Sequence, residues 1–135
     1  MKTTLTRRVT FCAGHRLFNP AWPDEKNREV FGLCANPNGH GHNYVLEVSV
    51  TGKVDPETGM VMNLKQVKAI IENQVVARVD HQNLNQDVDF MQGIIPTTEN
   101  LAQQIWIILD RAFPGEALSK LVLWESENNK VEISR

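Results

Sequence analysis

The sequence predicts an α+β domain in which a four-stranded antiparallel sheet carries two helices on one face, in the order ββααββ. Segments of alternating polarity open and close the 135-residue chain, as half-buried strands do. Between them lie two segments with apolar residues at helical spacing. Such grouping of strands and helices is typical of α+β architecture. The length favours one domain over residues 1–135.

The first two strands are expected over residues 4–14 and 42–54. In each, every second residue belongs to an apolar face that continues into a histidine: Leu5, Val9, Phe11, Ala13 and His15 in the first, and His42, Tyr44, Leu46, Val48 and Val50 in the second. The intervening residues 18–41 are rich in Asn, Pro, Gly and charge, which predicts a long loop.

Two helices and two further strands are expected after residue 55. Asn63 is a suitable N-cap for the first helix, and Gln66 completes a capping-box-like pair. Residues 96–99 open the second helix, which Pro114 and Gly115 end. Residues 80–95 are expected to be a loop, and residues 118–126 and 130–134 the final strands. The helical stripes comprise Leu64, Val67, Ile71 and Val75, and Leu101, Ile105, Ile108 and Ala112.

Composition excludes some classes of function. The chain has 14 Lys and Arg against 16 Asp and Glu, a net charge of −2, so the basic excess of a general nucleic-acid binder is missing. The N-terminal segment lacks the apolar region of a signal peptide, and no run is long enough to span a bilayer. We therefore expect a cytoplasmic protein, no membrane partner, and reduced thiols at Cys12 and Cys34.

Three of the four histidines predict a metal site. His40 and His42 are two residues apart in an extended segment, so their rings point the same way. His15 ends the first strand and supplies a third ligand if the two strands pair. Three protein ligands leave a coordination position open, which is typical of catalytic zinc. The alternative is a coincidental His-x-His with His15 as an ordinary strand residue.

Four further residues are candidates for chemistry, but the sequence pattern leaves their roles open. Cys34 lies in the loop before His40, where a nearby metal or imidazole would lower a thiol pKa and allow it to act as a base. Asp80 and His81 form either a polarised pair or an ordinary turn. Glu125 shares parity with apolar residues and therefore needs a partner, either a ligand with two parallel N–H donors or a basic side chain, unless it is at an exposed edge. Cys12, of opposite parity to His15, is expected to be a packed small residue.

Seven stretches resemble the family of 6-pyruvoyl-tetrahydropterin synthase and related 6-carboxy-tetrahydropterin synthases. The block from Asn36 to Tyr44, NPNGHGHNY, is the most specific of them. The stretches run in order along nearly the whole chain: Phe11–Leu17, Val30–Cys34, Asn36–Tyr44, Asp55–Leu64, Asp80–His81, Thr97–Asn100 and Trp124–Glu125. The family often has Ser at the positions of Cys12 and Gly14.

The resemblance implies the tunnelling fold (T-fold) and a homohexamer built as a dimer of trimers, with active sites at subunit interfaces. It implies Zn²⁺ bound by the three histidines and Cys34 as the catalytic thiol. Asp80 and His81 would partner the thiol from the adjacent subunit. Glu125 would anchor the pterin ring, with Thr97 and Thr98 nearby. The triphosphate site stays unassigned, and Arg16, Lys26 and Arg28 are candidates by location.

The implied reaction is a zinc-dependent lyase step of tetrahydrobiopterin biosynthesis, in which 7,8-dihydroneopterin triphosphate becomes 6-pyruvoyl-tetrahydropterin and loses triphosphate. One alternative is 6-carboxy-tetrahydropterin synthase of queuosine biosynthesis, which releases acetaldehyde from the same substrate. The Pro-Asn-Gly segment between Cys34 and His40 favours the pyruvoyl branch. A variant with Glu in place of the thiol is disfavoured by Cys34. A non-catalytic zinc or pterin-binding module would be expected to lose Cys34, Asp80 or His81.

Overall fold

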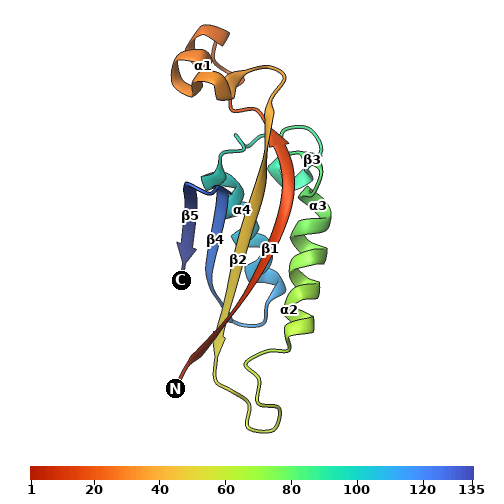
Figure 1. The fold of residues 1–135 in the computed structure, drawn as a ribbon. Helices are drawn as coiled ribbons and strands as arrows, with labels where there is room; N and C mark the ends of the chain where they lie inside the picture. The colour runs from red at the N-terminus through yellow and green to blue at the C-terminus, as the bar shows by residue number, and fades with distance from the viewer.

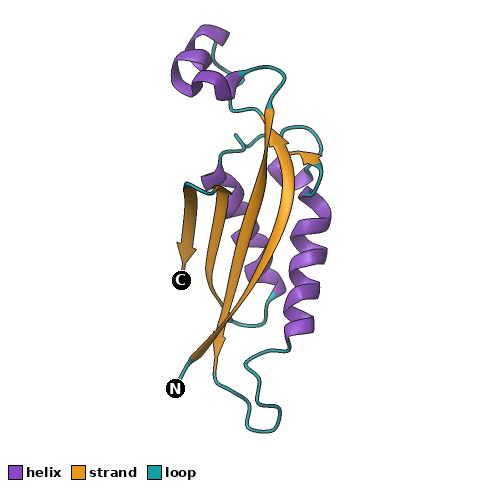
Figure 2. Cartoon of the chain, viewed as in Figure 1, coloured by secondary structure: helices purple, strands orange, loops and turns teal.

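A computed structural model describes residues 1–135 and shows one twisted sheet with helices packed against one face (Figures 1 and 2). Its four long strands, which the sequence predicted, are β1 (Thr3–His15), β2 (His40–Gly52), β4 (Leu118–Ser126) and β5 (Asn129–Ser134). They pair antiparallel in the order β1-β2-β4-β5. The α+β prediction is therefore confirmed in its main elements.

The sheet nevertheless has five strands, so the predicted count of four was wrong. The additional strand, β3 (Gln82–Asn83), pairs parallel with Ala13 and Gly14 at the outer edge of β1. A two-residue strand is too short to show alternation, which explains why the sequence pattern placed it within a loop. The rest of that segment contains a 3₁₀ turn at Asp89–Met91.

The expected loop over residues 18–41 is also partly helical, and this prediction is corrected. It contains α1 (Asp24–Phe31) and a 3₁₀ turn at Gly32–Ala35. Asp24 and Glu25 favour the start of α1 through the helix dipole. Only Asn27 of α1 is buried, so the helix has no apolar stripe that a sequence pattern could reveal. Figure 1 shows α1 standing beyond the end of the sheet.

The two predicted helices cover the sheet. The first runs from Leu64 to Val79 as α2 (Leu64–Ile71), a π-helical turn (Glu72–Val76) and α3 (Ala77–Val79). Its N-cap is Asn63, whose side chain accepts a hydrogen bond from the Lys65 amide; Gln66 makes no return bond to complete a capping box. The second, α4 (Thr98–Ala112), begins at its N-cap Thr97. No helix combines the length and apolar character that a bilayer crossing requires.

One face of the sheet and the two helices enclose the hydrophobic core. The predicted apolar faces of β1 and β2 point into it, and Tyr44, Leu46, Val48 and Val50 are fully buried. Cys12 was expected to be packed, but it is exposed. Its parity places it on the opposite face of β1, which no helix covers.

Candidate metal centre

The strand register brings the three predicted histidines together at the end of the sheet next to α1. His15 pairs directly with His40 across β1 and β2, and His42 lies two residues further along the same face. The Nε2 atoms of His15 and His40 are 3.1 Å apart. One ligand nitrogen from each of the three side chains lies within 4.8 Å of the others, so the cluster can hold one metal ion.

Burial and hydrogen bonding prepare His15 as a ligand. Its ring is 1% exposed, and Nδ1 lies 2.8 Å from the carbonyl oxygen of Pro96, the residue before the N-cap of α4. A carbonyl only accepts, so Nδ1 carries the proton and Nε2 keeps its lone pair for the cluster. Burial also lowers the pKa of His15 and of His42, which keeps both imidazoles neutral and available for coordination.

The site also contains a buried polar atom that lacks a hydrogen-bond partner. His42 Nε2 is buried and has no hydrogen-bond partner. Its nearest charged neighbour is Glu125 Oε1, 3.7 Å away. Buried polar atoms are normally paired, and a metal bound by three imidazoles would pair this one. The residues present therefore fit a divalent metal ion.

Glu125 reaches the histidines because β4 pairs with β2 and Glu125 lies on the same face of β4 as the buried Leu121 and Leu123. The β4–β5 register shifts between Trp124 and Ser126, so Glu125 has no cross-strand partner on β5. One carboxylate oxygen faces His42, and the other accepts a hydrogen bond from the hydroxyl of Thr98. Neither partner is the Arg or Lys that the sequence left open as an alternative.

Beside this carboxylate lies a cleft of about 580 Å³. Its polar lining includes Thr97, Thr98, Glu99, Glu125 and Lys130, and Leu17 and Phe31 supply apolar contacts. The volume is within the range of about 300–1,000 Å³ common for small-molecule sites. The cleft thus combines an apolar surface with two carboxylates and two hydroxyls.

Cys34 belongs to the 3₁₀ turn that follows α1 and is partly buried. Its carbonyl oxygen accepts a hydrogen bond from the Leu17 amide at 2.9 Å, which ties the turn to the chain just after His15. The thiol is outside the group of three metal-binding side chains.

Asp80 and His81 form a hydrogen-bonded pair at the outer edge of β1. His81 Nδ1 lies 3.1 Å from Asp80 Oδ2, and Asp80 Oδ1 accepts a hydrogen bond from the Cys12 amide at 2.9 Å. These donors lower the pKa of Asp80, with the Cys12 amide as the main cause. The His81 side chain is 79% exposed, and its backbone has a positive φ of 60°. Within one chain, no hydrogen bond joins this pair to Cys34.

Two supporting features were not anticipated from the sequence. The Pro96 carbonyl that orients His15 is 81 residues away in the chain. The contact of Glu125 with His42 depends on the pairing of β4 with β2. The sequence carries only an indirect signal for these two features. The turn residues before α4 and after β4 mark where the chain reverses direction.

The tight approach of Gly39 to His15 makes a testable prediction. Gly39 has φ +71°, and a Cβ there would lie 2.9 Å from the His15 carbonyl oxygen. Gly59, with φ +73° and open space around it, is the matched control. Both alanine variants should lose about 1–2 kcal/mol of stability from the left-handed backbone. Only Gly39→Ala should also weaken metal binding, by about 10–100-fold, because it displaces two ligands. Denaturation and metal titration measure these effects, and equal metal affinity in both variants would contradict the prediction.

Comparison with known proteins places this geometry in a family. The family model described as 6-pyruvoyl tetrahydropterin synthase matches residues 4–135. The 6-pyruvoyl tetrahydrobiopterin synthases of Pongo abelii and Homo sapiens are 46% and 45% identical over 127 residues, which cover 94% of this chain and 88% of each relative. The structure of Caenorhabditis elegans 6-pyruvoyl tetrahydropterin synthase superposes with a TM-score of 0.94 at 37% identity, covering 100% of this chain and 96% of that one. The chain therefore belongs to the 6-pyruvoyl tetrahydropterin synthase family.

Proposed function

We propose that this chain is a zinc-dependent lyase that converts 7,8-dihydroneopterin triphosphate to 6-pyruvoyl-tetrahydropterin with loss of triphosphate. The observation that carries the proposal is the three-histidine cluster in contact with Glu125, the carboxylate at the edge of a cleft. The histidine cluster suits a substrate with hydroxyls on its side chain, which a bound metal can ligate. The carboxylate in the cleft suits N–H donors on the substrate ring.

His15, His40 and His42 would hold the zinc ion. An all-imidazole donor set suits zinc, and three protein ligands leave a position for substrate oxygen. When bound, zinc would supply Lewis-acid polarisation of the side-chain oxygens. The Pro96 carbonyl holds His15 in the required tautomer, since Nδ1–H donates to it.

Glu125 would bind the pterin ring. A carboxylate accepts two parallel N–H donors, which the pyrimidine edge of a pterin offers. The Thr98 hydroxyl donates to this carboxylate and fixes its orientation. Thr97 lines the same cleft and begins α4.

Cys34 would move the side-chain proton, with Asp80 and His81 orienting and polarising the thiol from the adjacent subunit of a homohexamer. The exposed edge position of His81 supports a partner outside its own chain. The Asp80 carboxylate is held by the Cys12 amide and fixes the proton position on His81 Nδ1. A proton taken from the side-chain carbon can then be returned elsewhere on the same substrate.

The reaction balances within one molecule. Cleavage of the C–O bond to the triphosphate releases that group as an anion. The two side-chain carbinol carbons are oxidised to ketones, and the dihydropterin ring together with the carbon losing triphosphate accepts the electrons. No external redox cofactor is required, and this chain's residues need only bind, orient and transfer protons.

Glu125→Gln should lower kcat/KM for the pterin substrate by about 10- to 150-fold, since it loses the charge from two hydrogen bonds. The effect should lie mainly in KM, because the pyrimidine edge that Glu125 would bind is remote from the ring and side-chain atoms that react. Glu127→Gln, in the exposed β4–β5 turn, is the matched control and should leave the kinetics unchanged. Steady-state kinetics test this, and equal KM values for the two variants would refute ring anchoring by Glu125.

Metal dependence tests the proposed class of function. The protein stripped with a chelator should fail to release triphosphate from the substrate, and one equivalent of zinc should restore release. Substrate binding without turnover at full zinc loading would instead support a non-catalytic pterin-binding module. Triphosphate release that persists in the stripped protein would contradict the metal assignment.

A further inference from the structure

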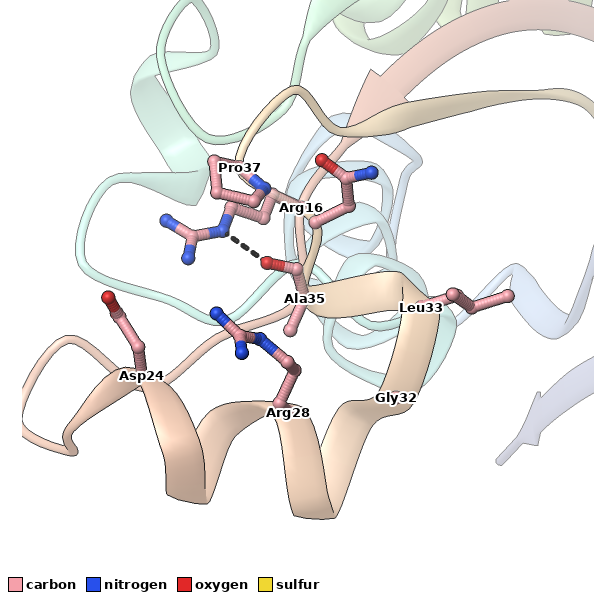
Figure 3. Close-up of a pocket in the computed structure, with 8 residues that line it drawn as sticks. Arg16, Asp24, Arg28, Gly32, Leu33, Ala35 and Pro37 are labelled. Atoms are coloured by element: carbon pink, nitrogen blue, oxygen red, sulfur yellow. Dashed lines mark hydrogen bonds between the residues drawn. The ribbon is translucent and has the colours of Figure 1, made fainter.

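A second cavity lies next to the metal centre, under α1. It encloses about 290 Å³ and is lined by Arg16, Asp24, Arg28 and the 3₁₀ turn that contains Cys34. In Figure 3, Arg16 and Arg28 direct their guanidinium groups toward the same space, with Asp24 at its edge. This volume is at the lower end of the range common for small-molecule sites, about 300–1,000 Å³, and leaves room for the charged group of a ligand.

Both guanidinium groups retain unused hydrogen-bond donors. Arg16 uses only Nε, which donates to the Ala35 carbonyl at 2.8 Å, while its planar group lies 4.0 Å from the Phe18 ring. Its position is therefore fixed while both terminal NH₂ groups stay free. Arg28 forms no ion pair with any carboxylate of the chain. Two unpaired guanidinium groups against one carboxylate give the cavity a net positive charge.

The cavity and the cleft beside Glu125 share a wall. Leu17 and Phe31 line the cleft, and their neighbours Arg16 and Gly32 line the cavity. Arg16 directly follows the metal ligand His15. A substrate with its ring in the cleft and its side chain at the histidines would carry a terminal group past His15 toward Arg16.

We propose that Arg16 and Arg28 form the binding site for the triphosphate group of the substrate. Planar guanidinium groups bind phosphate oxygens through two parallel hydrogen bonds, and paired arginines are a common solution for polyphosphates. Lys26, the third cation of this segment, is excluded because its Nζ lies 4.2 Å from the Trp22 ring and outside the cavity. The identity of the anion rests on the proposed function, whereas the anion site itself does not.

Inorganic triphosphate is the probe, and calorimetry on the full-length protein measures its binding. Arg28→Gln should weaken binding about tenfold, because it removes a charge-assisted, bidentate contact. Lys26→Gln removes the same charge from the same exposed helix and should change affinity less than twofold. Asp24→Asn should strengthen binding about threefold by removing the opposing charge. His42→Ala should still bind triphosphate, which separates this site from chelation of the metal.

Equal losses in Arg28→Gln and Lys26→Gln, or no loss in Arg28→Gln, would overturn the proposal, as would no binding by the unmodified protein. With 7,8-dihydroneopterin triphosphate, Arg28→Gln should raise KM about tenfold, and competition by unphosphorylated dihydroneopterin should be unchanged. If the unmodified protein binds inorganic triphosphate through Arg28 but does not convert this substrate, the anion site stands and the proposed function fails. If it converts the substrate with KM independent of Arg28, the function stands and the anion site fails.

Discussion

Cys34→Ala should lower kcat for triphosphate release by about 10²–10⁴-fold, the contribution expected of a positioned acid–base group. The metal content should stay at one ion per chain, because the thiol is outside the three-histidine cluster. Folding should be preserved, since the backbone carbonyl of residue 34, and not the thiol, bonds to Leu17. Kinetics and metal analysis on the same sample measure both quantities.

Cys12→Ala is the matched control for this substitution. The Cys12 side chain is exposed on β1, and only its backbone amide binds Asp80, so the variant keeps that contact. Its kcat should equal that of the unmodified protein. Full activity in Cys34→Ala, or an equal loss in both variants, would show that the catalytic proton moves through another group.

His42→Ala should lose both metal and turnover, with a fall in rate of at least about 10³-fold, because metal polarisation is worth several kcal/mol. His42 Nε2 is buried and has no hydrogen-bond partner, and its nearest charged neighbour is Glu125. We therefore expect this nitrogen to bind the metal. Removing the ring leaves two ligands, which do not complete a catalytic zinc site.

His81→Ala separates metal binding from proton transfer. His81 is exposed at the edge of β1 and does not belong to the three-histidine group, so this variant should keep its metal and lose turnover. Elemental analysis beside activity measurement distinguishes the two histidines. Normal metal content in His42→Ala would rule out the three-histidine centre.

The parts of the fold predicted from sequence are those with strong periodicity. The apolar faces of β1 and β2 continue into histidines, so pairing the strands was enough to predict the cluster. Asn63 was confirmed as a helix N-cap because side-chain capping is a local interaction. The α1 helix and β3 were missed because one buries only Asn27 and the other has two residues.

The features of the site that escaped prediction depend on distant segments. The hydrogen bond from His15 to Pro96 requires the segment before α4 to reach the end of β1, and the contact of Glu125 with His42 requires β4 to pair with β2. Cys12 shows a related limit. Strand parity correctly separated it from His15, but parity alone does not say whether a second layer covers that face.

The pterin product formed from 7,8-dihydroneopterin triphosphate by the zinc-loaded protein tests the central claim most directly. Mass spectrometry of the pterin and assay of the released fragment identify which side-chain bond breaks. We expect 6-pyruvoyl-tetrahydropterin with one equivalent of inorganic triphosphate. Acetaldehyde with 6-carboxy-tetrahydropterin would contradict the account and assign the chain to the carboxy branch.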